Sequence, residues 1–596
     1  MDPNISPRVA ALRAELTARG LQGLYIPHSD EYQNEYLPAN AERLAWATGF
    51  TGSAGAAVIL LDRAALFVDG RYTLQAEEQA PALFAREHLI EHPPEEWLVD
   101  ALKSGDKLGY DPRLSTPRSV RGLEKACKQA GAELVPLTNP IDALWTDRPP
   151  RPGQPARPHS VELAGESSAS KRERLAEELR RAHQDAAVIT ACDSIAWLLN
   201  IRGSDVDFNP LCLSFAILYA DASVDWFVHL DKVGPGITEH LGPDVRVHAE
   251  ESVAVALDTL GATRRKVRLD PTTTAAWFFD RLSAAGGEID EGDDPCRLPR
   301  AKKNAVELAG SRAAHKRDGA ALVRFLAWVD AKVQNGGTDE LLASDHLEAL
   351  RREAGAVDLS FASISGSGAN GAIVHYRSSP ETNRPLEQGN LYLIDSGGQY
   401  PDGTTDVTRT IAVGSPNAEH RDRFTRVLKG HIALSRARFP KGTTGTQLDA
   451  LARLPLWEIG LDYDHGTGHG VGCFLSVHEG PQRIGKAGNT VALRPGMVLS
   501  NEPGYYREQE FGIRHENLLL VTAGTTPADG ERAMHGFETL TLVPFERRLL
   551  ESGLLTEHET AWLDDYHRRV REALMPLLDA TDRQWLERAT RPLGSA

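Results

Sequence analysis

The chain has 596 residues and is therefore expected to fold into two to four domains rather than around a single core. Its formal net charge of −17 and its pI near 5.7 disfavour nucleic acid and anionic membranes as partners. No apolar run approaches the roughly 20 residues that span a bilayer, and the charged start lacks the apolar core of a signal peptide.

The cysteines are scattered and odd in number, and they lack the spacing of a metal-binding or redox motif. This pattern indicates buried or free thiols in a reducing compartment, so we expect a cytoplasmic protein. The five residues are Cys127, Cys192, Cys212, Cys296 and Cys473.

The first region, residues 1–150, has the pattern of an α/β domain. Apolar residues recur at helical spacing over 7–19, which predicts a helix that ends at a glycine. A buried strand is predicted at 23–28, and two strands around a turn at 56–72. A proline-rich linker at 146–160 marks the first domain boundary.

The second region, residues 151–300, alternates helices and strands in the same way, which predicts a second α/β domain with helices on a mixed sheet. Its architecture echoes that of the first region, although the two share no visible sequence repeat. Helices are predicted at 168–184 and 193–200, and strands at 186–190 and 213–220. An acidic, turn-rich segment at 286–295 marks the second boundary.

The third region, residues 301–596, mixes long helices with short strands. One or two amphipathic helices are predicted over 297–333, and another over 338–356. Strands are predicted at 359–368 and 371–376, on either side of a glycine-rich bend. Further helices are predicted at 418–437, 446–460, 561–578 and 581–590, with a strand at 538–546.

Two carboxylates mark a predicted hairpin in this region. Leu391–Ile394 reads as an apolar strand that ends in Asp395, and the Gly- and Pro-containing turn after it precedes a β-branched strand at 404–413. A hairpin centred between Tyr400 and Pro401 would place Asp395 directly opposite Asp406. Two facing carboxylates repel each other unless a cation lies between them or one of them is protonated. For each aspartate alone, a turn-capping role is the simpler interpretation.

Three further residues make the cation the better interpretation. His469 lies in the glycine-rich segment HGTGHG, where the backbone can approach a ligand closely. Glu502 and Glu516 lie at the ends of apolar runs, where an unpaired carboxylate is costly. Four carboxylates balance the charge of two divalent ions, and a carboxylate-rich set with one imidazole suits cations such as Mn²⁺.

The ordered set Asp395, Asp406, His469, Glu502 and Glu516, in the segments HGTGHGVG, VHEGP, NEPGYY and GIRHEN, resembles the metallopeptidase family of aminopeptidase P, prolidase and methionine aminopeptidase. The segments are most similar to those of the three-domain Xaa-Pro aminopeptidases. The resemblance implies an α+β chain: creatinase-like α/β domains at 1–150 and 151–300, then a pita-bread catalytic domain with a helical tail at 301–596.

By this resemblance, Asp406 and Glu516 bridge two metal ions, Asp395 binds one ion, and His469 and Glu502 bind the other. The ions would be Mn²⁺, with Zn²⁺ or Co²⁺ as alternatives. Glu502 would accept the proton of the attacking water. The tail would support a homodimer, and the substrates would be peptides with proline in the second position.

The resemblance also assigns roles to four residues that could otherwise be structural. His375 would contact substrate, His478 would stabilise the oxyanion, and His465 would assist proton transfer, whereas each histidine alone reads as a surface or core residue. By the same resemblance, His469 and Arg71 would also contact the substrate. Without the resemblance, Arg71 reads as a surface arginine.

Four other functions are compatible with part of this sequence pattern. A prolidase shares the five ligands but acts on dipeptides, and the additional middle domain argues against it. A creatinase-like enzyme and a non-catalytic peptidase-like binding module lack the ligand set that this chain retains. A cysteine peptidase built on Cys473 would need a positioned base, and the nearby His469 is already assigned to the metal.

Overall fold

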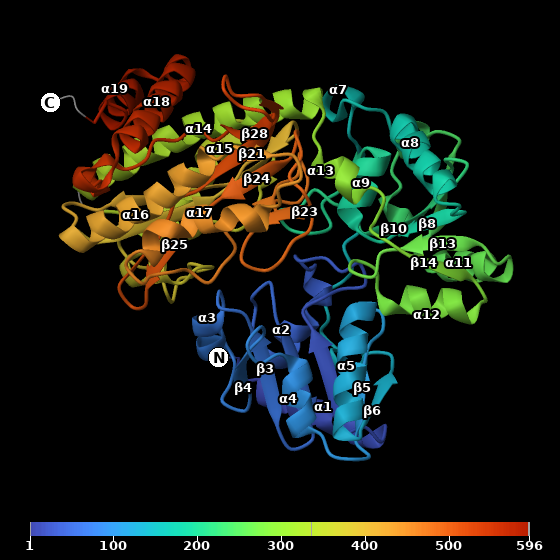
Figure 1. Cartoon of the computed structure of the whole chain (residues 1–596). Helices are drawn as coiled ribbons and strands as arrows, with labels where there is room; N and C mark the ends of the chain where they lie inside the picture. The colour runs from blue at the N-terminus through green and yellow to red at the C-terminus, as the bar shows by residue number, and fades with distance from the viewer. Residues whose placement is uncertain (1, 335–336, 594–596) are drawn as a thin grey trace. The chain divides into compact units, whose positions relative to one another are not determined.

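The computed structural model describes residues 2–334 and 337–593, and the chain divides into two compact units, the first ending at Arg297 and the second beginning at Leu298 (Figure 1). Among the described residues, no helix combines the length and apolarity that crossing a membrane requires.

The first unit contains a six-stranded mixed sheet in the order β4-β3-β2-β1-β5-β6. Its strands are β1 (Gly23–Pro27), β2 (Ala56–Leu60), β3 (Ala64–Val68), β4 (Ala85–His88), β5 (Lys107–Tyr110) and β6 (Glu133–Pro136). Alternate residues of β1 and β2 point to opposite faces. On one face, Leu24 and Ile59 belong to a hydrophobic core shared with α1 (Ile5–Ala18) and α2 (Arg43–Thr48). On the other face, Tyr25 and Val58 belong to a second hydrophobic core, shared with α4 (Pro94–Ala101) and α5 (Pro117–Ala130). The strands predicted at 23–28 and 56–72 are confirmed.

A second six-stranded sheet of this unit has the order β12-β11-β10-β8-β13-β14. Its strands are β8 (Ala186–Ile189), β10 (Ser214–Tyr219), β11 (Val224–Val228), β12 (Val245–Ala249), β13 (Lys266–Leu269) and β14 (Glu288–Glu291). The strand order and the pattern of antiparallel and parallel pairs match those of the first sheet. Its longer helices are α8 (Ser168–Arg181), α9 (Cys192–Leu199), α11 (Val253–Ala262) and α12 (Ala276–Ala284). The domain boundaries predicted at residues 150 and 300 stay predictions.

The second unit is built on two sheets flanked by helices. One sheet has the order β16-β17-β20, and the other the order β21-β28-β27-β24-β22-β23. The strands are β16 (Ile364–Ser367), β17 (Leu391–Ser396), β20 (Val407–Ala412), β21 (Phe439–Pro440), β22 (Gly468–Gly470), β23 (Glu479–Ile484), β24 (Val498–Asn501), β27 (Asn517–Thr525) and β28 (Met534–Thr539). β25 (Gly504–Arg507) and β26 (Phe511–Arg514) form a separate hairpin. Because β28 ends at Thr539, the prediction of a strand at 538–546 is wrong for residues 540–546.

Helices cover these sheets in pairs, as Figure 1 shows for α14 with α15 and for α16 with α17. The longer helices are α14 (Ala305–Gln334), α15 (Glu340–Glu353), α16 (Ala418–Ser435), α17 (Gly445–Trp457), α18 (Glu557–Leu574) and α19 (Ala580–Ala589). Phe325 and Leu347 of the first pair pack on Tyr392 and Ile394 of β17. This apolar layer fixes the strand that carries the first predicted ligand.

One buried ion pair offers a test of the second sheet's stability. Lys232 lies 2.7 Å from Asp205, and both side chains are almost fully buried. Burial raises the pKa of Asp205 above its ordinary value, and the charge of Lys232 opposes this rise.

We expect Lys232→Met to lower the free energy of unfolding by about 3–5 kcal/mol at pH 8, because Asp205 is left buried without its cation. Without Lys232, the folded-state pKa of Asp205 rises further, so protonation relieves the penalty and the deficit shrinks at pH 5.5. Urea unfolding followed by tryptophan fluorescence measures both values. Arg265→Met, which breaks the exposed pair with Asp185, is the control and should cost less than about 1 kcal/mol.

Candidate metal centre

The hairpin of β17 and β20 supplies the first two predicted ligands. Asp395 lies in β17, and Asp406 immediately precedes β20. The predicted register was wrong: Asp395 pairs with Thr408, because the connection forms its own small hairpin in which Tyr400 pairs with Gly403. The true centre therefore lies one residue later than predicted. Asp406 remains a diagonal neighbour of Asp395 on the same side of the hairpin.

The larger, six-stranded sheet of the second unit supplies the other three predicted ligands. His469 lies in β22, Glu502 directly follows β24, and Glu516 directly precedes β27. Glycine is needed on both sides of His469, since a Cβ at Gly468 or Gly470 would lie about 2 Å from a backbone oxygen of a neighbouring strand. The loop predicted around His469 is thus a short strand held between β23 and β24.

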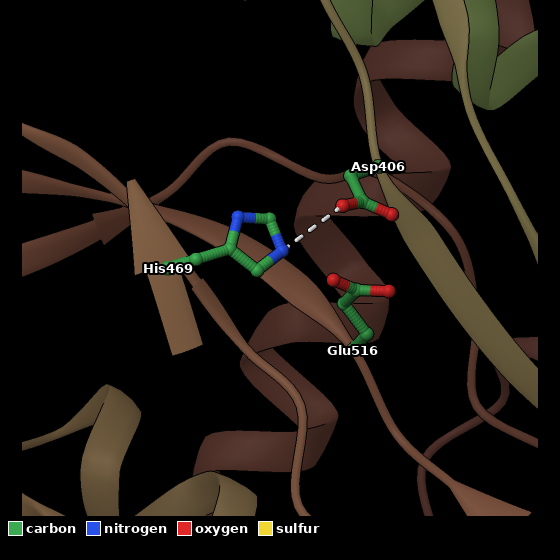
Figure 2. Close-up of side chains that lie close together, drawn as sticks. All are labelled: Asp406, His469 and Glu516. Atoms are coloured by element: carbon green, nitrogen blue, oxygen red, sulfur yellow. Dashed lines mark ion pairs between the residues drawn. The ribbon is translucent and has the colours of Figure 1, made fainter. Parts of the chain in front are cut away.

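The five residues form one cluster, here called the ligand cluster, and Figure 2 shows three of them, Asp406, His469 and Glu516. Ligand atoms of Asp406, His469 and Glu516 all lie within 4.8 Å of one another. His469 Nε2 lies 3.5 Å from Asp406 Oδ2 and 3.5 Å from Glu502 Oε1. Asp395 is close enough to interact electrostatically with Asp406 and Glu502.

The electrostatics of the ligand cluster are those of crowded negative charges. Burial, and then the charges of neighbouring carboxylates, raises the pKa of Glu516 well above its ordinary value. Burial raises the pKa of Asp395 to about 6, although Arg514 opposes the rise. Burial alone would lower the pKa of His469, but its hydrogen bond to Asp406 and the charge of Glu502 raise it to about 9. All three shifts indicate a place that favours additional positive charge.

These donors fit divalent metal ions. Four carboxylates and one imidazole provide the oxygen-rich set that Mn²⁺ and related cations bind. Oδ1 of Asp395 is buried and has no hydrogen-bond partner among the described residues, which is costly for a carboxylate oxygen unless a cation binds it.

A guanidinium that the sequence analysis missed supports the ligand cluster. Arg514, which is 2% exposed, donates to Asp395 Oδ2 at 2.6 Å and to the Tyr506 hydroxyl at 2.7 Å. The Thr408 hydroxyl donates to Glu516 Oε2 at 2.8 Å. The only local signal was the position of Arg514 in GIRHEN, two residues before a predicted ligand.

Two of the predicted histidines adjoin this network. The ring of His478 packs edge-on against His469, with their centroids 4.4 Å apart. His465 Nε2 lies 2.8 Å from the hydroxyl of Tyr506, which in turn accepts from Arg514. His478 precedes Glu479, whose buried carboxylate pairs with Lys303 and Arg300.

His375 lies in a turn after the 3-10 helix Gly368–Ala372, so the strand predicted at 371–376 was wrong. That helix packs against β17 and β26. Arg71 belongs to the first unit, where it forms an ion pair with Asp69 at 2.7 Å. The functional roles predicted for His375 and Arg71 stay predictions.

The geometry disfavours Cys473 as a nucleophile. It is buried, and its Sγ approaches the carbonyl oxygens of Asp402 at 3.5 Å and Glu307 at 3.8 Å. Both contacts orient the thiol toward structural backbone groups.

Comparisons with protein families cover nearly the whole chain. Residues 309–523 match metallopeptidase family M24, and residues 533–593 match the C-terminal region of that family. Residues 8–144 and 147–307 match two models of the creatinase/prolidase N-terminal domain. The predicted α+β chain, with creatinase-like domains before a pita-bread domain, is thereby confirmed.

Similar proteins extend over the full length. Aminopeptidase P2 of Arabidopsis thaliana is 40% identical, covering 96% of this chain and 86% of the relative. A probable Xaa-Pro aminopeptidase P of Coprinopsis cinerea is 39% identical, covering 99% of this chain and 98% of the relative. The crystal structure of X-prolyl aminopeptidase from Caenorhabditis elegans, a cytosolic enzyme with a di-nuclear active site, is 34% identical with a TM-score of 0.95, covering 99% of this chain and 100% of that one.

We expect Glu516→Gln to lower the amount of tightly bound metal at least tenfold, because it removes a charged donor from the centre of the ligand cluster. Metal content would be measured by mass spectrometry after equilibration with Mn²⁺ and desalting. Glu510→Gln is the control, since Glu510 is exposed and pairs with Arg507 instead. Retention of the wild-type metal content by Glu516→Gln would contradict the assignment.

Proposed function

The chain belongs to metallopeptidase family M24, and from that membership we propose that it is a metal-dependent aminopeptidase that releases the N-terminal residue from peptides with proline in second position. The observation that carries this proposal is the ligand cluster, in which all five expected ligands meet in a fold that matches an X-prolyl aminopeptidase over its full length.

Two divalent metal ions, with Mn²⁺ as the first choice and Zn²⁺ or Co²⁺ as alternatives, would occupy the ligand cluster. The residues that would hold them are Asp395, Asp406, His469, Glu502 and Glu516. Support comes from the ligand atoms of Asp406, His469 and Glu516, which all lie within 4.8 Å of one another, and from the 3.5 Å contact of His469 with Glu502. When bound, the ions would lower the pKa of a shared water, so that a nucleophile is available near neutral pH.

The chain's own residues then position the substrate and move protons. Glu502 would accept the water's proton on its carboxylate, one oxygen of which already accepts from Ser500 at 3.0 Å. His478, held against His469, would donate to the carbonyl oxygen on which negative charge develops. His465 would assist proton transfer, since Tyr506 and Arg514 connect it to Asp395 by hydrogen bonds. His375, His469 and Arg71 would contact the peptide.

We also propose a cytoplasmic homodimer. α17 presents a stripe of exposed apolar side chains, with Leu451, Leu454 and Trp457 at 37%, 52% and 43% exposure. Their spacing of three residues puts them on one face of the helix. Among the described residues of the C-terminal tail, Leu577 is the one large apolar side chain that is exposed to solvent. The exposed surface therefore favours α17 over the tail as the contact.

The activity is tested with Arg-Pro-Pro, Ala-Pro and Arg-Ala-Ala, using metal-stripped protein with and without Mn²⁺. We expect Mn²⁺-dependent release of arginine from Arg-Pro-Pro alone. Preference for Ala-Pro would indicate a prolidase. Failure of the metal-loaded protein to cleave any of the three would reject the peptidase proposal and favour a peptidase-like binding module.

The dimer is tested by Leu454→Glu, which places a charge in the apolar stripe. We expect the molecular mass measured by light scattering to fall from that of a dimer to that of a monomer at micromolar concentration. The control is Leu342→Glu on α15, because Leu342 is similarly exposed at 57% but lies outside the stripe. A monomeric wild-type protein, or a dimeric Leu454→Glu variant, would contradict the proposal.

A further inference from the structure

A cavity of about 230 Å³ lies in the second unit, and none of the five predicted ligand residues lines it. It is lined by residues of α14, β20, the segment 544–548 and α19. Its apolar wall includes Leu326, Ile411, Phe545 and Trp585. The volume exceeds the ~150 Å³ that accommodates benzene in an engineered apolar cavity, and falls below the ~300 Å³ of common drug-sized pockets. The cavity therefore suits a small ligand with one ring or a short chain.

The charged groups around the cavity do not balance. Its lining includes four arginines but only two acidic residues, Asp330 and Glu546. Both acids pair with the same arginine, Arg548, at 3.0 and 2.6 Å. Within residues 2–334 and 337–593, Arg409, Arg547 and Arg588 have no carboxylate partner within ion-pair distance. The cavity thus carries an excess of positive charge.

Arg547 provides a specific unfulfilled donor. Its two terminal nitrogens donate to the carbonyl oxygens of Arg588 and Pro592, at 3.1 and 3.2 Å. Its Nε is buried and has no hydrogen-bond partner among the described residues. A buried guanidinium nitrogen without an acceptor is costly, and a ligand anion is the kind of group that would satisfy it.

Arg409 adds a buried charge to the same wall. It is 2% exposed and donates to oxygens without formal charge, including Val543 O at 2.7 Å and Pro544 O at 3.1 Å. Its guanidinium lies over the Phe545 ring, 4.2 Å from the centroid. An anion in the cavity would partly compensate this charge, whereas a cation would be repelled.

From this combination of apolar wall, uncompensated guanidinium groups and orphan Nε, we propose that the cavity is a second ligand site, specific for a small carboxylate with an apolar body. The apolar part would pack against Trp585 and Ile411, and the carboxylate would accept from Arg547. This inference is independent of the proposed peptidase activity.

The test is isothermal titration calorimetry on the metal-loaded full chain with 3-phenylpropionate, 3-phenylpropan-1-ol and 3-phenylpropylamine. These probes share the apolar body and differ in charge. We expect the carboxylate to bind at least tenfold more tightly than the alcohol, and the amine not to bind. Equal affinity for the carboxylate and the alcohol would overturn the proposal.

Variants separate the cavity from the metal centre, to which a carboxylate could also bind. Ala589→Trp fills the cavity and should abolish binding, and Arg547→Met should remove the preference for the carboxylate over the alcohol. Arg568→Met is the matched control, since Arg568 is exposed and pairs with Asp565 and Glu572. Undiminished binding to Ala589→Trp or an unchanged preference in Arg547→Met would each reject this site. The Arg547→Met result decides the matter if Ala589→Trp does not fold.

Discussion

The crowding of four carboxylates and one imidazole in a buried space is the constraint around which the second unit is arranged. Burial, and then repulsion among these acids, raises the pKa of Asp395 and of Glu516. The strands must nevertheless converge there, so the chain places its ligands within or next to strand ends, and uses glycines where two strands approach too closely for a Cβ. Arg514 supplies a fixed positive charge next to Asp395, to which it donates a hydrogen bond. Divalent cations bound to the ligand cluster would supply the remaining compensation.

Part of this arrangement was predictable from local sequence. Each predicted ligand lies beside an apolar run or a glycine-rich segment, and those patterns predict strand ends and tight turns without knowledge of the fold. The register of the β17–β20 hairpin was not predictable in this way. The turn residues permit more than one centre, and the small β18–β19 ladder (Gly398–Tyr400 and Gly403–Thr404), paired also with β15 (Asp358–Leu359), selects the true one.

The residues that escaped prediction act through contacts between distant parts of the chain. Arg514 meets Asp395 across 119 positions, and Arg409 donates to the carbonyl oxygen of Glu516 across 107 positions. Neither has a local pattern that distinguishes it from a surface arginine. The equivalent strand order of the two sheets in the first unit was foreseen only as a general likeness, because a topology can persist where no sequence repeat is visible.

Arg409 also bears on how proteins of this architecture can change over evolutionary time. Its guanidinium donates at once to Glu516 O of the ligand cluster, to Val543 O and to the Tyr566 hydroxyl of α18. The C-terminal helices are therefore joined by a buried side chain to the backbone of Glu516, a proposed metal ligand. A region joined in this way is not an interchangeable module. Recombination that replaced it with an unrelated segment would have to replace the acceptors of Arg409 as well, so the tail and the catalytic sheet are expected to be inherited together.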